Sequence, residues 1–100
     1  MQIPTELESK AVNNWSVDDV SIWLSHNSIP QDCVNIIKGE EIDGMSITAL
    51  DIPALKEIGL TRFGPRVNTF NLINALIDHG KRDQAVRENI APMLTSVILL

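Results

Sequence analysis

The middle of the chain, residues 42–67, constrains the fold most strongly, because turn residues and helix-capping residues alternate there with short apolar runs. Asp43-Gly44 is a turn dipeptide, and Leu50-Asp51-Ile52-Pro53 places a capping acid directly before a proline in the first turn of a helix. Gly59 follows the next apolar run at the position of a helix stop. The stretch therefore predicts three short helices in succession, with hinges at Gly44, Asp51 and Gly64.

A helix with a clear start and a clear apolar face precedes this stretch. Ser16 and Asp19 fit its first turn, where a hydroxyl caps an unpaired N–H and an acid meets the positive end of the helix. Val20, Trp23 and Leu24 then share one face at helical spacing. This pattern predicts a helix whose apolar face packs into a core.

The last helix is expected to be the longest, because apolar residues recur every three or four positions after Gly64-Pro65. Gly80 is its expected stop, and Cys33 in the second helix is expected to lie in the core. The sequence thus predicts an all-α fold, a compact five-helix bundle with flexible termini. The expected helices are Val17 to His26, Gln31 to Lys38, Met45 to Leu50, Ile52 to Ile58 and Pro65 to Asp78.

Both ends of the chain fall outside this periodic region. Residues 1–14 show no sustained period, and we expect a disordered leader there. Residues 15–79 are expected to form the domain. Residues 80–100 form a tail that we place outside the core fold. Two interpretations of its apolar end are open. The chain is a domain excerpt, cut inside a longer protein or carrying added residues, or the apolar end is a docking peptide.

Composition argues against several classes of function. The formal charge is −5 and only eight residues are Lys or Arg, whereas nucleic-acid binding depends on clustered cations. The single Cys33 cannot form an internal disulfide, and no basic-then-apolar signal pattern opens the chain, so we expect a reducing cytosolic or nuclear setting. Of the two, the cytoplasm is the predicted location. No run reaches the roughly 18 apolar residues of a membrane span, so direct membrane insertion is not expected.

Catalytic and metal-binding patterns are poorly supported. His26 and His79 fall at the ends of predicted helices, and neither has a partner at catalytic or metal-ligand spacing. The acids between Asp18 and Asp51 lack the alternating oxygen ligands and closing Glu of a calcium loop. We therefore expect no enzyme activity, no metal, no cofactor and no small-molecule substrate.

Charge is divided between two neighbouring stretches of the sequence. Residues 31–57 hold six acids and two lysines, a formal charge of −4, whereas residues 58–70 hold Arg62 and Arg66 and no acid. These two arginines lie near the start of the last predicted helix, where unpaired N–H groups add positive potential. The pattern indicates two surfaces of opposite charge, unless the charges are simply a solvated face.

Several motifs in a fixed order resemble the sterile alpha motif (SAM) domain over Trp15 to about Asp78. They are the opening Trp15-Ser16-Val17-Asp18-Asp19-Val20, then Ile42-Asp43-Gly44, Leu55-Lys56-Glu57-Ile58-Gly59-Leu60 and Gly64-Pro65-Arg66. The opening and the last junction are similar to SAM domains of fungal polarity and signalling scaffolds. Three positions depart from the family: Cys33 and Ile37 stand where aromatics are common, and Pro65 replaces a more usual polar residue.

The resemblance implies a non-enzymatic protein interaction module that pairs with another SAM domain, either its own copy or a different protein's, in a signalling or polarity scaffold. In such pairs a mid-loop surface on one domain binds an end-helix surface on the other. By resemblance, the end-helix surface comprises Arg62, Gly64, Pro65, Arg66 and Val67. The mid-loop surface comprises Glu40, Glu41, Asp43, Met45, Leu50 and Asp51.

An alternative function is binding of an RNA stem-loop through the start of the last helix, as some SAM domains do. Arg62 and Arg66 would carry it, followed by Asn68 and Thr69. Two arginines are little charge for phosphate affinity, so nucleic acid is not the favoured partner. The sequence leaves open whether the assembly is homotypic or heterotypic, and whether it is a closed dimer or a polymer.

Overall fold

A computed structural model describes the backbone of residues 1–99 and the side chains of residues 1–81. Every regular element in this described part is helical, so the predicted all-α, five-helix bundle is confirmed. Two short 3₁₀ turns precede the five α-helices. The elements are η1 (Thr5–Leu7), η2 (Val12–Asn14), α1 (Val17–His26), α2 (Gln31–Gly39), α3 (Gly44–Ile47), α4 (Ile52–Ile58) and α5 (Phe63–Leu99).

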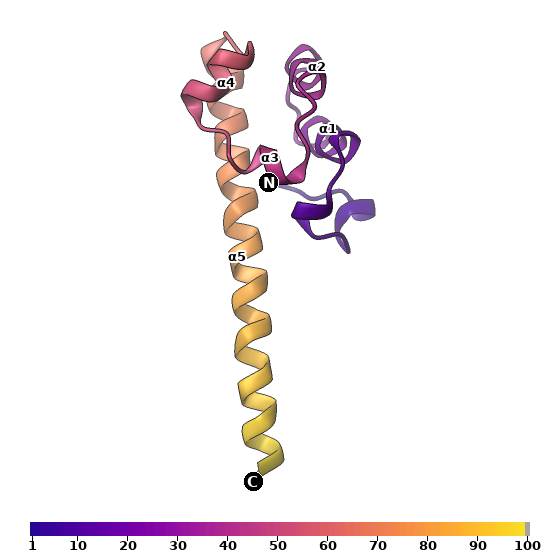
Figure 1. Cartoon of the computed structure of the whole chain (residues 1–100), viewed down its shortest axis with the longest axis vertical. Helices are drawn as coiled ribbons and strands as arrows, with labels where there is room; N and C mark the ends of the chain where they lie inside the picture. Colours follow the sequence, from indigo (N-terminus) through magenta and orange to yellow (C-terminus); the bar gives the residue numbers. More distant parts are fainter. Residues whose placement is uncertain (100) are drawn as a thin grey trace.

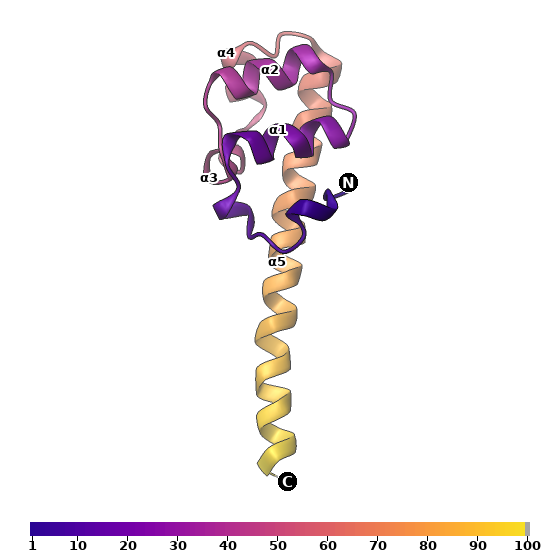
Figure 2. The ribbon, with the colours of Figure 1, turned by 90° about the vertical axis from the view of Figure 1, so that its right-hand side faces the viewer.

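The first four helices and the N-terminal part of α5 enclose one hydrophobic core. Figure 2 shows α1 and α2 side by side, crossing this part of α5, with α3 and α4 at their edge. The rings of Trp15 and Trp23 meet inside the bundle, with centroids 5.9 Å apart and planes inclined by 55°. Cys33 is buried in the same hydrophobic core, as predicted. Other core residues include Leu24, Ile37, Ile47, Leu55, Leu60, Ile73 and Leu76.

Local caps set the bounds of α1 and α4, which are the two helices whose ends match the sequence prediction. At α1, the Asp19 N–H donates to Ser16 Oγ and the Ser16 N–H donates to Asp19 Oδ2, which forms a capping box. At α4, the Asp51 side chain accepts from the Ala54 N–H. Gly59 closes that helix with φ 123°, a conformation that favours glycine.

The last helix differs from its predicted bounds at both ends. It begins at Phe63 and continues through Gly80 to Leu99, so the predicted stop at Gly80 is wrong. A glycine costs only about 1 kcal/mol inside a helix relative to alanine, and nothing here forces it into a left-handed conformation. Figure 1 shows the C-terminal half of α5 running well past the bundle. None of the described helices has the length and apolar content to cross a bilayer.

The first 14 residues lie along the bundle, which differs from the predicted disordered leader. Leu7 is 2% exposed and belongs to the core. The Gln2 N–H donates to Asn27 Oδ1 at 2.8 Å, and Asn27 Nδ2 donates back to the Gln2 carbonyl at 2.8 Å. Lys10 pairs with Asp19 at 2.8 Å. These contacts join residues far apart in the sequence, which is why composition and periodicity alone did not indicate them.

Candidate functional site

The mid-loop surface lies where α2 ends and α3 begins. Glu40 and Glu41 follow α2 and are exposed, and Glu41 has φ 56°, which turns the chain toward α3. Met45 on α3 is 65% exposed, an unusual fraction for a large apolar side chain. Leu50 is half-buried and packs against the core. The structure therefore leaves two acids and one large apolar side chain of this surface exposed.

The other two acids of the mid-loop surface are helix caps. Asp43 Oδ1 accepts from the Ser46 N–H at 3.0 Å, and this hydrogen bond holds the pKa of the Asp43 carboxyl below its usual value. Asp51 caps α4 in the same way. Their charges contribute to the acidic character of the surface, while their oxygens are partly used in holding α3 and α4.

The end-helix surface does not present two free arginines. Arg66 is only 9% exposed, and its Nη1 donates to the carbonyl oxygens of Leu60 at 3.1 Å and Thr61 at 3.2 Å. It thereby holds the turn between α4 and α5. The charge count of the sequence predicted an outward-facing cation here, whereas the guanidinium is a structural donor to two backbone carbonyls.

Arg62 is exposed but paired within the chain. Its Nη2 lies 2.7 Å and 2.8 Å from the two oxygens of Asp32 on α2, and 3.5 Å from the Cys33 sulfur. The hydrogen bond to Cys33 and the charge of Asp32 raise the pKa of the Arg62 guanidinium. Asp32 and Arg62 are 30 residues apart, so sequence spacing gave no sign of the pair.

Phe63 is a candidate residue that the sequence analysis missed. It is 70% exposed at the first position of α5, and the Arg66 guanidinium carbon lies 5.7 Å from its ring centroid. Gly64 is exposed beside it, and Pro65 and Val67 are half-buried. The i, i+4 spacing of Phe63 and Val67 extends the apolar periodicity of α5 by one turn, which is the signal that could have identified it.

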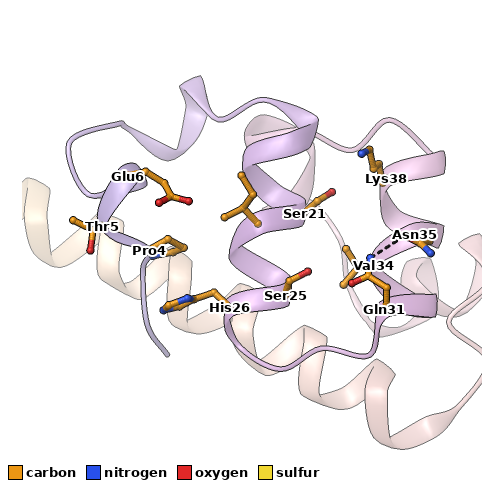
Figure 3. A pocket seen from close by; sticks show the side chains of 11 residues that line it. Pro4, Thr5, Glu6, Ser21, Ser25, His26, Gln31, Val34, Asn35 and Lys38 are labelled. Atoms are coloured by element: carbon orange, nitrogen blue, oxygen red, sulfur yellow. Dashed lines mark hydrogen bonds between the residues drawn. The ribbon is translucent and has the colours of Figure 1, made fainter.

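A shallow hollow of about 570 Å³ lies elsewhere, between η1, α1 and α2 (Figure 3). His26 lies at its edge, Ile22 is partly exposed within it, and Gln31 Nε2 donates to Asn35 Oδ1 at 3.0 Å. None of the residues of the mid-loop or end-helix surface lines this hollow. No group of three metal-ligating side chains occurs among the residues whose side chains are described.

Residues 12–77 match the family model of the SAM domain, the sterile alpha motif. The chain belongs to the SAM family. The matched region contains α1 to α4, the first part of α5 and every residue of both candidate surfaces. Searches of curated proteins and of solved structures gave no significant match. SAM domains are generally protein–protein interaction modules, so the class of function expected from the resemblance applies to this domain at the level of the family.

Proposed function

We propose that this SAM domain binds a second SAM domain, its own copy or a different protein's, through the mid-loop and end-helix surfaces. One observation carries the proposal. Met45 and Phe63 are the two most exposed large apolar side chains in the described part of the molecule. Met45 belongs to the mid-loop surface, and Phe63 stands between Arg62 and Gly64 of the end-helix surface, to which we now add it. Exposed apolar side chains rimmed by polar residues are typical of interaction sites.

The two surfaces are separate, so one domain offers two different faces. Figure 2 shows α3, which carries Met45, at one edge of the bundle and the start of α5, which carries Phe63, away from it at the top. A contact between unlike faces is heterologous and leaves a free face on each participant unless the assembly closes. This arrangement supports a linking role, and we propose that the domain serves it in a cytoplasmic signalling or polarity scaffold.

The RNA alternative requires the two arginines as phosphate ligands. Arg66 is buried against backbone carbonyls and Arg62 is paired with Asp32, so an approaching phosphate would compete with both sets of contacts. Sequence-independent affinity for nucleic acid grows with the number of cations that contact phosphate. The contacts of Arg62 and Arg66 therefore favour a protein partner over a stem-loop.

Matched substitutions test the proposal. Met45→Ser and Phe63→Ser each remove one exposed apolar side chain, and Ile22→Ser is the control because Ile22 is 41% exposed outside both surfaces. Binding to a panel of purified SAM domains, this chain included, is measured by calorimetry. We expect each partner that binds to lose about tenfold or more with one of the two surface variants and little with Ile22→Ser.

Two results would contradict the proposal. In the first, a partner binds all three variants as tightly as the parent, which removes both surfaces from the contact. In the second, no SAM domain of the panel binds, whereas RNA stem-loops bind tightly and with strong salt dependence. Circular dichroism of each variant confirms that the helical content is unchanged before binding is compared.

A further inference from the structure

We infer that the mid-loop surface binds a basic surface on a different protein and not the end-helix surface of a second copy of this chain. The inference rests on the proposed function and names the partner of one of its two surfaces. It follows from where the cations of this chain are held. The sequence alone indicated an acidic surface and a basic surface that could pair with each other. In the structure, both arginines of the basic surface are already bound to groups of their own chain.

The acids of the mid-loop surface remain available to a partner. Glu40 and Glu41 are exposed, and neither forms an ion pair with any cation in residues 1–81. Met45, on α3 four residues after Glu41 in the sequence, is 65% exposed. The surface therefore combines an apolar centre with uncompensated negative charge, and it fits a partner that places Lys or Arg around an apolar side chain.

The end-helix surface of a second copy does not supply that partner. The Arg62 guanidinium lies against both oxygens of Asp32, so this pair presents a net charge near zero. Arg66 is 9% exposed and faces two carbonyls. An acidic surface that approached Arg62 would also approach Asp32, and the repulsion from Asp32 would offset the attraction to Arg62.

The other described cations are Lys10, Lys38, Lys56 and Lys81, and none of them belongs to the end-helix surface as defined here. Lys10 and Lys38 are paired with Asp19 and Asp18, at 2.8 Å and 3.2 Å. Lys56 on α4 is followed directly by Glu57. The whole chain carries a formal charge of −5, so two copies repel each other at long range. Electrostatics therefore slow the meeting of two copies and favour a basic partner.

The test uses as probe a second copy of this chain whose end-helix surface is made locally basic. Asp32→Asn frees Arg62 from its internal partner, and Gly64→Lys adds a cation at an exposed helical position where a Cβ meets nothing within 4 Å. The probe also carries Met45→Ser, so that it cannot use its own mid-loop surface. Sedimentation velocity measures the parent alone, the probe alone and the equimolar mixture at low salt. A parent with Glu40→Gln and Glu41→Gln is the matched control.

We expect the parent alone to stay monomeric at about 100 µM, and the mixture to form a one-to-one complex at least about tenfold tighter than any self-association of the parent. The complex should weaken as salt rises and should be lost with the Glu40→Gln, Glu41→Gln parent. If the parent self-associates as tightly as it binds the probe, the inference is wrong and the proposed function stands. If neither the parent nor the mixture associates, the mid-loop surface does not bind a basic surface and the inference is wrong, while the panel of SAM domains still decides the proposed function.

Discussion

The backbone N–H of Gly44 donates to the backbone carbonyl of Trp15 at 3.0 Å, which joins the start of α3 to the end of η2. A Cβ at Gly44 would lie 1.7 Å from the Val12 carbonyl oxygen. We therefore expect Gly44→Ala to displace η2 and to lower the free energy of unfolding by about 2 to 4 kcal/mol, measured by urea denaturation.

The matched control for Gly44→Ala is Gly64→Ala. A Cβ at Gly64 meets nothing within 4 Å, and the residue lies in the first turn of α5. Alanine is the better helix former, so this variant should be neutral or more stable by up to about 1 kcal/mol. Equal effects of the two substitutions would mean that the close approach at Gly44 does not constrain the fold.

Trp23 should be the costliest single side chain to truncate. It is fully buried on α1, against the ring of Trp15. Trp23→Ala should lower the free energy of unfolding by about 3 to 5 kcal/mol, a large part of the stability of a small domain. This loss of stability is measured by thermal unfolding, followed by circular dichroism. A melting temperature within a few degrees of the parent would contradict the burial of Trp23.

Leu7 should contribute to stability although it lies outside the family match. Its side chain is 2% exposed, so Leu7→Ala should cost about 2 to 5 kcal/mol in chemical denaturation. Glu8→Ala, at the exposed next position, should change stability by less than about 0.5 kcal/mol. If the two variants unfold at the same denaturant concentration, residues 1–14 are a dispensable leader, as the sequence indicated.

Arg66 should act on folding rather than on partner choice. Arg66→Met leaves the carbonyls of Leu60 and Thr61 without their side-chain donor, which should cost about 2 to 4 kcal/mol by urea denaturation. Arg62→Gln, which breaks only an exposed ion pair, should leave the denaturation midpoint nearly unchanged. For the same reason, Arg66→Glu would disturb folding and is not a suitable way to reverse the charge of the end-helix surface in a binding experiment. A stable, fully helical Arg66→Met variant would overturn this assignment.

Asp19 should make stability depend on pH in the acid range. The hydrogen bond from Lys10 and those from Ser16 lower the pKa of the Asp19 carboxyl in the folded state. Its stabilisation is therefore present above the unfolded-state value of about 3.9 and is lost as pH falls through the lower folded-state value. The difference in stability between the parent and Asp19→Asn should shrink below about pH 4. If the difference in stability between the two proteins is constant from pH 3 to pH 7, this role of Asp19 is wrong.

Local chemistry made α1 and α4 predictable from the sequence. Ser16 and Asp19 define one helix start, and Asp51 with Gly59 defines the bounds of the other. A capping contact joins residues three or four positions apart, so its partners are visible in the sequence. The last helix was mispredicted for the opposite reason, because Gly80 is a stop signal only when the chain adopts a left-handed turn there.

The sequence did not indicate which of the charged candidate side chains are already engaged within the fold. Met45, Glu40 and Glu41 are exposed, and so are Phe63 and Gly64 at the start of α5. The state of the arginines depends on Asp32 and on two backbone carbonyls, and the Asp32 contact crosses 30 residues of sequence. Counting charges along the sequence treats every charged side chain as exposed and unpaired. Only the packed chain shows which cations are already bound.

The two ends of this chain offer different attachment points for a label. The Gln2 backbone exchanges two hydrogen bonds with Asn27, so a tag fused at Met1 would sit against the turn between α1 and α2 and report on that contact. The far end of α5 lies away from the bundle, in a molecule whose longest dimension is 59 Å (Figure 1). A fluorophore or immobilisation handle there leaves both candidate surfaces clear, and surface-coupled binding assays should use that orientation.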